Sequence, residues 1–166
     1  MQNNPDLPTS NIFDNLNGFI LNKKHYYGLR VFYEDTDAGN IVYHANYLKF
    51  FERARSSLLK LLNINQFDLK KNKDVVLVAR KAQIDWYKAA QLNDTLLIES
   101  RLKYAKNSSI TIEQKVYRYL DCKKSYDFLV LGVIQIVAID SDFKVRRIKL
   151  ILNNSYLNAQ THSFLQ

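Results

Sequence analysis

The chain has 166 residues, of which 47% are hydrophobic and 13% aromatic, as is typical of one globular domain with a sizeable core. Its single cysteine, Cys122, excludes an internal disulfide framework, and no uninterrupted apolar segment approaches the roughly 20 residues that span a bilayer. The net charge of +8 favours anionic partners, but no basic run exceeds two residues, so we expect no nucleic-acid-binding function. The polar, acidic start does not resemble a signal peptide, and a cytoplasmic location is the expectation.

The first elements along the chain are expected to be an extension, a strand and a long helix. Residues 1–24 are asparagine-rich with little periodicity, whereas residues 25–33 are rich in aromatic and β-branched side chains and predict a strand. A turn-like segment, "DTDAGN", separates this strand from a helix that opens near His44 and stops at Asn63. Apolar residues at steps of three and four predict the buried stripe: Tyr47, Phe50, Phe51, Ala54, Leu58 and Leu61. Charged residues are expected on the other side: Lys49, Glu52, Arg53 and Arg55.

Beyond the helix, the hydrophobic period changes to two. Residues 76–86, 96–104 and 110–116 alternate between apolar and polar side chains, and residues 128–140 are apolar at nearly every position, which predicts four strands. Because the connecting turns are short, these strands must be antiparallel neighbours. One amphipathic helix and one half-polar antiparallel sheet give an α+β fold in two layers.

The Asp35-Thr-Asp37 stretch admits several interpretations. A calcium loop of the EF-hand type is excluded, because it needs glycine at its sixth position and glutamate at its twelfth, where this sequence has Asn40 and Asn46. The histidines and the cysteine lack the short spacing of a transition-metal site, and no "GxSxG" motif indicates a serine hydrolase. A simple turn, in which one aspartate caps backbone amides and Gly39 supplies a permissive conformation, stays open at this point.

Taken as a whole, "YEDTDAGNIVYHANYLKFFERAR" at residues 33–55 resembles a known signature. It is that of the hotdog-fold acyl-CoA thioesterases of the 4-hydroxybenzoyl-CoA thioesterase family, in particular the bacterial branch associated with the Tol–Pal envelope system. Weaker similarity covers roughly residues 26–140. The resemblance implies a five-stranded antiparallel sheet around one long helix, which is also what the periodicities predict. We therefore expect a thioesterase domain over residues 25–150, flanked by the extension at 1–24 and a tail at 151–166.

The resemblance also implies roles for individual residues. Asp37 matches the catalytic carboxylate of the family, either as a nucleophile that forms a mixed anhydride or as a general base for water. The backbone N–H of His44 is the implied donor to the thioester oxygen, and a further role for its imidazole stays open. Asp35 and Gly39 are implied to be structural residues of the active-site loop.

Four further residues are candidates for binding substrate. Tyr43 and Tyr47 flank the site and are candidates for lining an acyl or pantetheine channel, although Tyr47 also fits the apolar stripe of the helix. Arg80 and Lys81 match an Arg-Lys pair in the related enzymes, where they would contact the phosphates of coenzyme A or form ordinary ion pairs. Neither a metal nor another cofactor is expected.

Two functions follow from the resemblance. The first is hydrolysis of acyl-CoA, or of an acyl group on acyl carrier protein, by a homodimer or homotetramer whose paired subunits cover exposed sheet edges. The second is a binding or scaffold protein of the same fold, associated with acyl carriers or the envelope, in which hydrolysis is incidental. The carboxylate of Asp37 beside a glycine and a helix start favours the enzyme.

Overall fold

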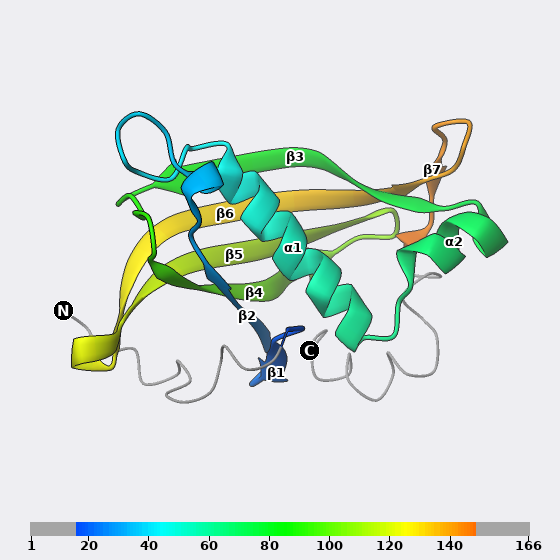
Figure 1. The fold of residues 1–166 in the computed structure, drawn as a ribbon. Coiled ribbons are helices and arrows are strands. Elements are labelled where there is room, and N and C mark those ends of the chain that lie inside the picture. The colour runs from blue at the N-terminus through cyan, green and yellow to red at the C-terminus, as the bar shows by residue number, and fades with distance from the viewer. Residues whose placement is uncertain (1–15, 149–166) are drawn as a thin grey trace.

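The computed structural model describes residues 16–148, which form one antiparallel sheet with a long helix, α1 (Asn46–Leu61), lying across one face (Figure 1). The seven strands are β1 (Phe19–Leu21), β2 (Lys24–Arg30), β3 (Val76–Trp86), β4 (Thr95–Ala105), β5 (Ser109–Leu120), β6 (Ser125–Ile139) and β7 (Val145–Arg146). The strand order is β1-β2-β4-β5-β6-β3, and β7 also pairs with β6. The remaining elements are α2 (Gln66–Lys73) and the 3-10 turns η1 (Tyr33–Asp35) and η2 (Asp121–Lys123).

The predicted α+β fold is confirmed, with two additions at the margins of the sheet. Strands β2 to β6 correspond to the five expected ones, whereas β1 and β7 have only three and two residues. β1 falls within the segment 1–24 that was expected to be an extension, and residues 1–15 lie outside the described part of the chain, as does the expected tail at 151–166. Among the described residues, no helix is long and apolar enough to cross a membrane.

The apolar stripe of α1 forms the centre of the core. Tyr47, Phe50, Phe51 and Ala54 are each at most 1% exposed, and they face apolar side chains of β4, β5 and β6. The helix lies close to the sheet because Gly132 in β6 has no side chain. A Cβ atom at Gly132 would come within 2.6 Å of the Phe51 ring.

One charged residue of α1 is not where the sequence pattern put it. Arg55 was expected on the exposed side of the helix, and this expectation is wrong, because the side chain is buried between α1 and the sheet. Its guanidinium donates to Gln114 Oε1 at 2.8 Å and to Glu52 Oε2 at 2.7 Å. Gln114 in turn donates to the carbonyl of Phe51 and to Ser100 Oγ. Burial is tolerated because the charge is paired and hydrogen-bonded.

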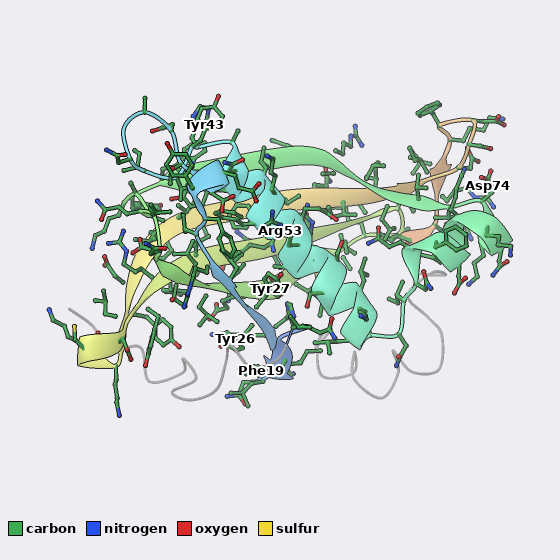
Figure 2. The ribbon with its side chains drawn as sticks, in the orientation of Figure 1. Phe19, Tyr26, Tyr27, Tyr43, Arg53 and Asp74 are labelled. Carbon is green, nitrogen blue, oxygen red and sulfur yellow. The ribbon has the colours of Figure 1, made fainter. Side chains whose placement is uncertain are left out.

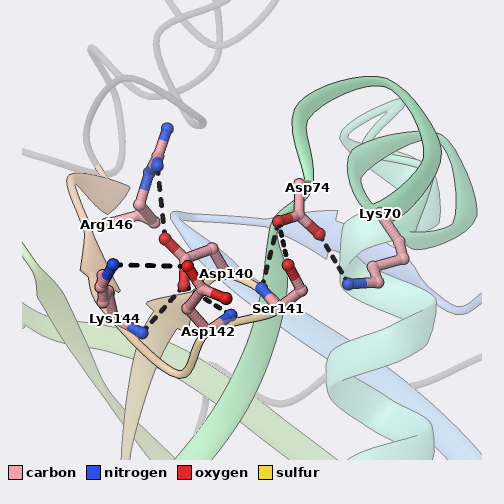
Figure 3. A network of polar contacts seen from close by, with 7 residues as sticks. All are labelled: Lys70, Asp74, Asp140, Ser141, Asp142, Lys144 and Arg146. Atoms are coloured by element: carbon pink, nitrogen blue, oxygen red, sulfur yellow. Dashed lines mark hydrogen bonds and ion pairs between the residues drawn. The ribbon is translucent and has the colours of Figure 1, made fainter.

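A polar network joins α2 to the turn between β6 and β7 at the far end of the sheet (Figure 3). Asp74 ends α2 in a left-handed conformation, and its carboxylate accepts hydrogen bonds from Lys70 Nζ at 2.7 Å and from Ser141 Oγ at 2.6 Å. These hydrogen bonds, that of Lys70 first, lower the pKa of Asp74. In the adjoining turn Asp140 accepts from the backbone of Lys144 and pairs with Arg146. The network fixes the start of β3.

We predict that Gly132→Ala destabilises the protein by about 1–3 kcal/mol, the usual cost of overpacking a filled core. The added methyl group would clash with the Phe51 ring and push α1 away from the sheet. Urea denaturation followed by circular dichroism measures the change. An unchanged free energy of unfolding would mean that the helix does not sit this close to β6.

His25 in β2 makes stability depend on pH. Its side chain is fully buried, with Nε2 3.2 Å from the Asn17 carbonyl and 3.4 Å from Ser57 Oγ, and among residues 16–148 Nδ1 has no hydrogen-bond partner. Burial lowers the pKa of His25 below its ordinary value of 6.5. As the pH falls below that value, the unfolded chain therefore takes up the proton before the folded one does.

We predict that neutral His25 contributes to the free energy of unfolding above about pH 6.5. This contribution is lost as the pH falls through the lowered pKa of His25. His25→Gln keeps a donor for the Asn17 carbonyl but does not titrate. The melting temperature of the wild type should therefore fall more steeply between pH 7 and pH 5 than that of His25→Gln. Parallel curves for the two proteins would contradict this assignment.

Candidate active site

The candidate site is the loop between η1 and α1, near the end of β3 (Figure 1). Thr36 pairs with Val42, and Ile41 pairs with Gln91, so that the segment 41–43 lies between two other stretches of backbone. The described residues contain no group of three or more His, Cys, Asp or Glu side chains that could hold a metal ion. The chemistry of the loop therefore depends on its carboxylates, its amides and the aromatic rings around it.

The two aspartates of the loop lie in contrasting environments. Asp35 is buried, and its Oδ2 accepts the N–H of Phe32 at 2.9 Å. The backbone carbonyl of Asp35 accepts two more hydrogen bonds, from the N–H of Tyr43 and from Asn46 Nδ2, each at 2.9 Å. Asp35 thus connects the two ends of the loop.

Asp37 is exposed, and within residues 16–148 its hydrogen bonds all go to its own loop. Its Oδ1 accepts the N–H of Gly39 at 2.8 Å, and its carbonyl accepts the N–H of Asn40, which has a left-handed φ of 58°. A Cβ atom at position 39 would come within 3.0 Å of Asp37 Oδ1, so glycine leaves room for the carboxylate to fold back. This geometry is that of the turn considered above, and it also presents a carboxylate to incoming ligands.

His44 lies in the turn immediately before α1, which begins two residues later than expected, at Asn46. Within residues 16–148, no protein acceptor binds the N–H of His44, so this donor is open to a ligand. The imidazole is exposed and packs between two rings, that of Tyr43 at 4.4 Å and that of Trp86 at 6.0 Å between centroids. Figure 2 shows Tyr43 beside the first turn of α1, well away from Phe19 and Tyr26.

Trp86 lies beside the candidate site, and the sequence pattern did not identify it. It ends β3, is 49% exposed, and contacts the His44 ring edge to face. Its place in an alternating strand suggested an ordinary core side chain, and alternation alone does not show that the strand ends beside the loop. A large aromatic residue at a strand end, next to the exposed Tyr87, is the signal that could have found it.

The other expected substrate-binding residues lie apart from the loop. Tyr47 is 1% exposed, and its hydroxyl accepts the N–H of Ala90 at 3.0 Å, so it occupies the core position that was its alternative. Arg80 and Lys81 are exposed at a bulge in β3, where the register shifts between Ala79 and Lys81. Arg80 lies six positions before Trp86, which is roughly 20 Å along a strand. Within one subunit, Arg80 and Lys81 therefore lie too far from the loop to act together with Asp37.

Comparison with known proteins agrees with the geometry. Residues 39–119 match the family model described as the thioesterase superfamily. The acyl-CoA thioesterase YbgC of Haemophilus influenzae is 41% identical over 99 residues, which cover 60% of this chain and 73% of that protein. The chain belongs to the thioesterase superfamily. A second YbgC acyl-CoA thioesterase, from Helicobacter pylori, is 39% identical over 88 residues, or 53% of this chain and 63% of that protein.

Solved structures of this superfamily share the fold. A probable thioesterase from Bartonella henselae is 31% identical, with a TM-score of 0.67 over 75% of this chain and 98% of that one. An aspartate-to-asparagine mutant of 4-hydroxybenzoyl-CoA thioesterase, in complex with 4-hydroxybenzoyl-CoA, is 16% identical, with a TM-score of 0.70 over 75% of this chain and 91% of that one. The predicted hotdog fold and the predicted thioesterase family are both confirmed.

Proposed function

We propose that this protein hydrolyses acyl-CoA thioesters, with Asp37 as the catalytic carboxylate and the backbone N–H of His44 as the donor to the thioester oxygen. The observation that carries the proposal is the loop itself, which presents an exposed carboxylate and an open amide on adjoining stretches of backbone. The likeness to the YbgC thioesterases supports acyl-CoA as the substrate class. A cytoplasmic location stays the prediction.

The chemistry needs a negative charge to be stabilised on the carbonyl oxygen and an oxygen nucleophile to attack the carbonyl carbon. The N–H of His44, assisted by the positive end of α1, would supply the first. Asp37 would supply the second in one of two ways. It either attacks the carbonyl, expels the coenzyme A thiolate and leaves a mixed anhydride for water to cleave, or it removes a proton from a water molecule that attacks directly.

The remaining groups would bind and orient the substrate. The exposed rings of Tyr43 and Trp86 flank the imidazole of His44 and offer an apolar wall for the acyl or pantetheine chain. Arg80 and Lys81 would meet the phosphates of coenzyme A from a second subunit. β3 ends the described sheet, so it is free to pair with its copy. A two-fold axis near Gln83 would place Arg80 of one chain opposite Trp86 of the other.

The proposal is tested by assaying purified protein with short, long and aromatic acyl-CoA substrates, and with an acyl group on acyl carrier protein, in buffer that contains a chelator. We expect thiol release from at least one acyl-CoA. Inactivity across the whole panel would favour a binding or scaffold protein. Activity that the chelator abolishes and a metal restores would overturn the proposed mechanism.

We predict that Asp37→Asn lowers turnover by at least about 10²-fold, the low end of what a positioned proton acceptor contributes. The melting temperature should change little, because the asparagine oxygen can still accept the N–H of Gly39. Asp35→Asn should have the smaller effect on rate, and Asp35→Ala should cost about 1 kcal/mol of stability, as for a lost cap. Turnover and melting temperature are measured for each variant.

Two outcomes would contradict these assignments. If Asp37→Asn keeps wild-type turnover while Asp35→Asn loses it, the roles of the two aspartates are reversed. If both variants stay active, the Asp-Thr-Asp stretch is only a turn, and the catalytic group lies elsewhere.

We predict a dimer or larger assembly, paired through β3, whose specific activity falls on dilution. Gln83→Glu places like charges opposite each other at the expected axis and should produce monomers of low activity. Asn107→Glu, on an exposed residue between β4 and β5, adds the same charge away from β3 and serves as the control. Sedimentation at micromolar concentration gives the mass. A wild-type mass near the 19.5 kDa of one chain would contradict the prediction.

A further inference from the structure

The first two residues of α1, Asn46 and Tyr47, have buried polar side chains that the proposed reaction does not use. Asn46 is 6% exposed and Tyr47 is 1% exposed. Neither side chain is placed to touch a substrate at the surface of the loop. Both instead form hydrogen bonds to backbone atoms on either side of the segment 41–43, which leads directly into His44.

Asn46 anchors one side of this segment. Its Nδ2 donates to the carbonyl of Asp35, which also accepts the N–H of Tyr43. The N–H of Asn46 donates to the carbonyl of Tyr43 at 2.8 Å. One residue of the helix therefore binds both the stretch that carries Asp37 and the residue that precedes His44.

Tyr47 anchors the other side through the stretch of backbone around Ala90, between β3 and β4. Its hydroxyl accepts the N–H of Ala90 at 3.0 Å, and the carbonyl of Ala90 accepts the N–H of Val42 at 2.8 Å. Ala90 is fully buried. If the hydroxyl of Tyr47 is removed, water cannot reach the N–H of Ala90 to replace this hydrogen bond. Burial raises the pKa of Tyr47, which keeps the phenol neutral through the range in which an enzyme of this class is assayed.

The segment that contains Ala90 also forms hydrogen bonds to β5. Arg118 in β5 donates from Nε to Asp94 Oδ2 at 2.7 Å and also donates to the carbonyl of Ala89. Asp94 Oδ2 accepts the N–H of Gln91 at 2.7 Å. The hydrogen bond of Tyr47 thus connects α1 to a stretch that the sheet already fixes, and not to a loose loop.

We propose that Asn46 and Tyr47 are positioning residues that clamp the segment 41–43 from both sides and thereby aim the N–H of His44 at the developing oxyanion. This inference rests on the proposed function, because it needs the amide to act on the thioester oxygen. Such a donor works only within about 2.7–3.1 Å of the place where the oxyanion forms. Displacement by about 1 Å can cost about 10²-fold in rate.

The test uses two variants that remove one hydrogen bond each with little change in volume. Tyr47→Phe removes the acceptor for Ala90, and Asn46→Asp removes the donor to Asp35. We expect kcat to fall by about 10- to 10²-fold in each, with KM changed by less than about 3-fold, since the amide would act on the transition state. Assays run well below each melting temperature, so that a lower folded fraction cannot mimic the effect.

Two matched controls use the same substitutions elsewhere. Tyr104→Phe removes the hydroxyl of a tyrosine that is 49% exposed on β4, and Asn63→Asp changes an exposed asparagine beyond the end of α1. Both should keep wild-type kcat. A second signature belongs to Asn46→Asp alone. A protonated carboxyl group can donate to the Asp35 carbonyl, so the activity of this variant relative to the wild type should recover as the pH falls from 8 to 5.5.

Amide hydrogen exchange separates failure of the clamp from failure of the proposed function. Tyr47→Phe should speed exchange at Val42 and Ala90, and Asn46→Asp at Tyr43, whether or not the protein is a thioesterase. Unchanged exchange, or wild-type kcat in both variants of an active enzyme, would overturn the inference. If Tyr47→Phe does not fold, Asn46→Asp decides alone. If the wild type is inactive but the variants show the expected faster exchange, the proposed function is wrong. The clamp then exists but does not serve catalysis.

Discussion

The burial of one apolar stripe of α1 against the sheet determines where every group of the candidate site lies. Phe50, Phe51 and Ala54 are fully buried, and each large side chain contributes about 1.5–3 kcal/mol by leaving water. The ring of Phe51 rests on the backbone at Gly132, which sets how near the helix comes to β6. Because a helix is stiff, fixing its middle also fixes its first turn. Asn46 and Tyr47 are therefore rigid supports for the loop that precedes them.

Burial also separates the roles of two aspartates that are only two residues apart. Asp35 faces inward and uses its carboxylate to accept the N–H of Phe32 at the start of its own turn. A reacting thioester has no path to it without disrupting the loop. Asp37 faces outward, and its Oδ1 accepts the N–H of Gly39 in its own turn. The buried carboxylate of Asp35 therefore stabilises the loop, whereas the exposed carboxylate of Asp37 is accessible to a ligand.

Most of the fold was predictable because long elements repeat their pattern several times. The strands β3, β4 and β5 have 11 or 12 residues, most of which alternate between apolar and polar side chains, and the apolar spacing in α1 spans four turns. β1 and β7 were missed because two or three residues cannot show a period. α2 was missed because its eight residues, "QFDLKKNK", present only Leu69 to the core.

The site was predictable where a motif identifies residues by type and not where tertiary contacts decide. Asp37, Gly39 and His44 could be identified by their resemblance to a known signature. Arg55 was placed on the wrong side, since its burial depends on Gln114, a partner 59 residues away. Trp86 was missed for the same reason, because its contact with His44 joins the end of β3 to a distant loop.

Within residues 16–148, β3 is an edge strand of the sheet, and this edge connects the shape of one chain to the proposed assembly. Tyr43, Trp86 and Tyr87 are 44%, 49% and 59% exposed near the end of this strand. Exposing several aromatic rings to water together is unfavourable. The charged pair that would suit the phosphates of coenzyme A lies on the same edge but too far away to serve the same chain. Pairing of two β3 strands would cover the rings and bring the basic pair of each chain to the loop of the other. Such pairing, if the proposed assembly forms, would account both for the exposed aromatic side chains and for the distance of Arg80 and Lys81 from the candidate loop.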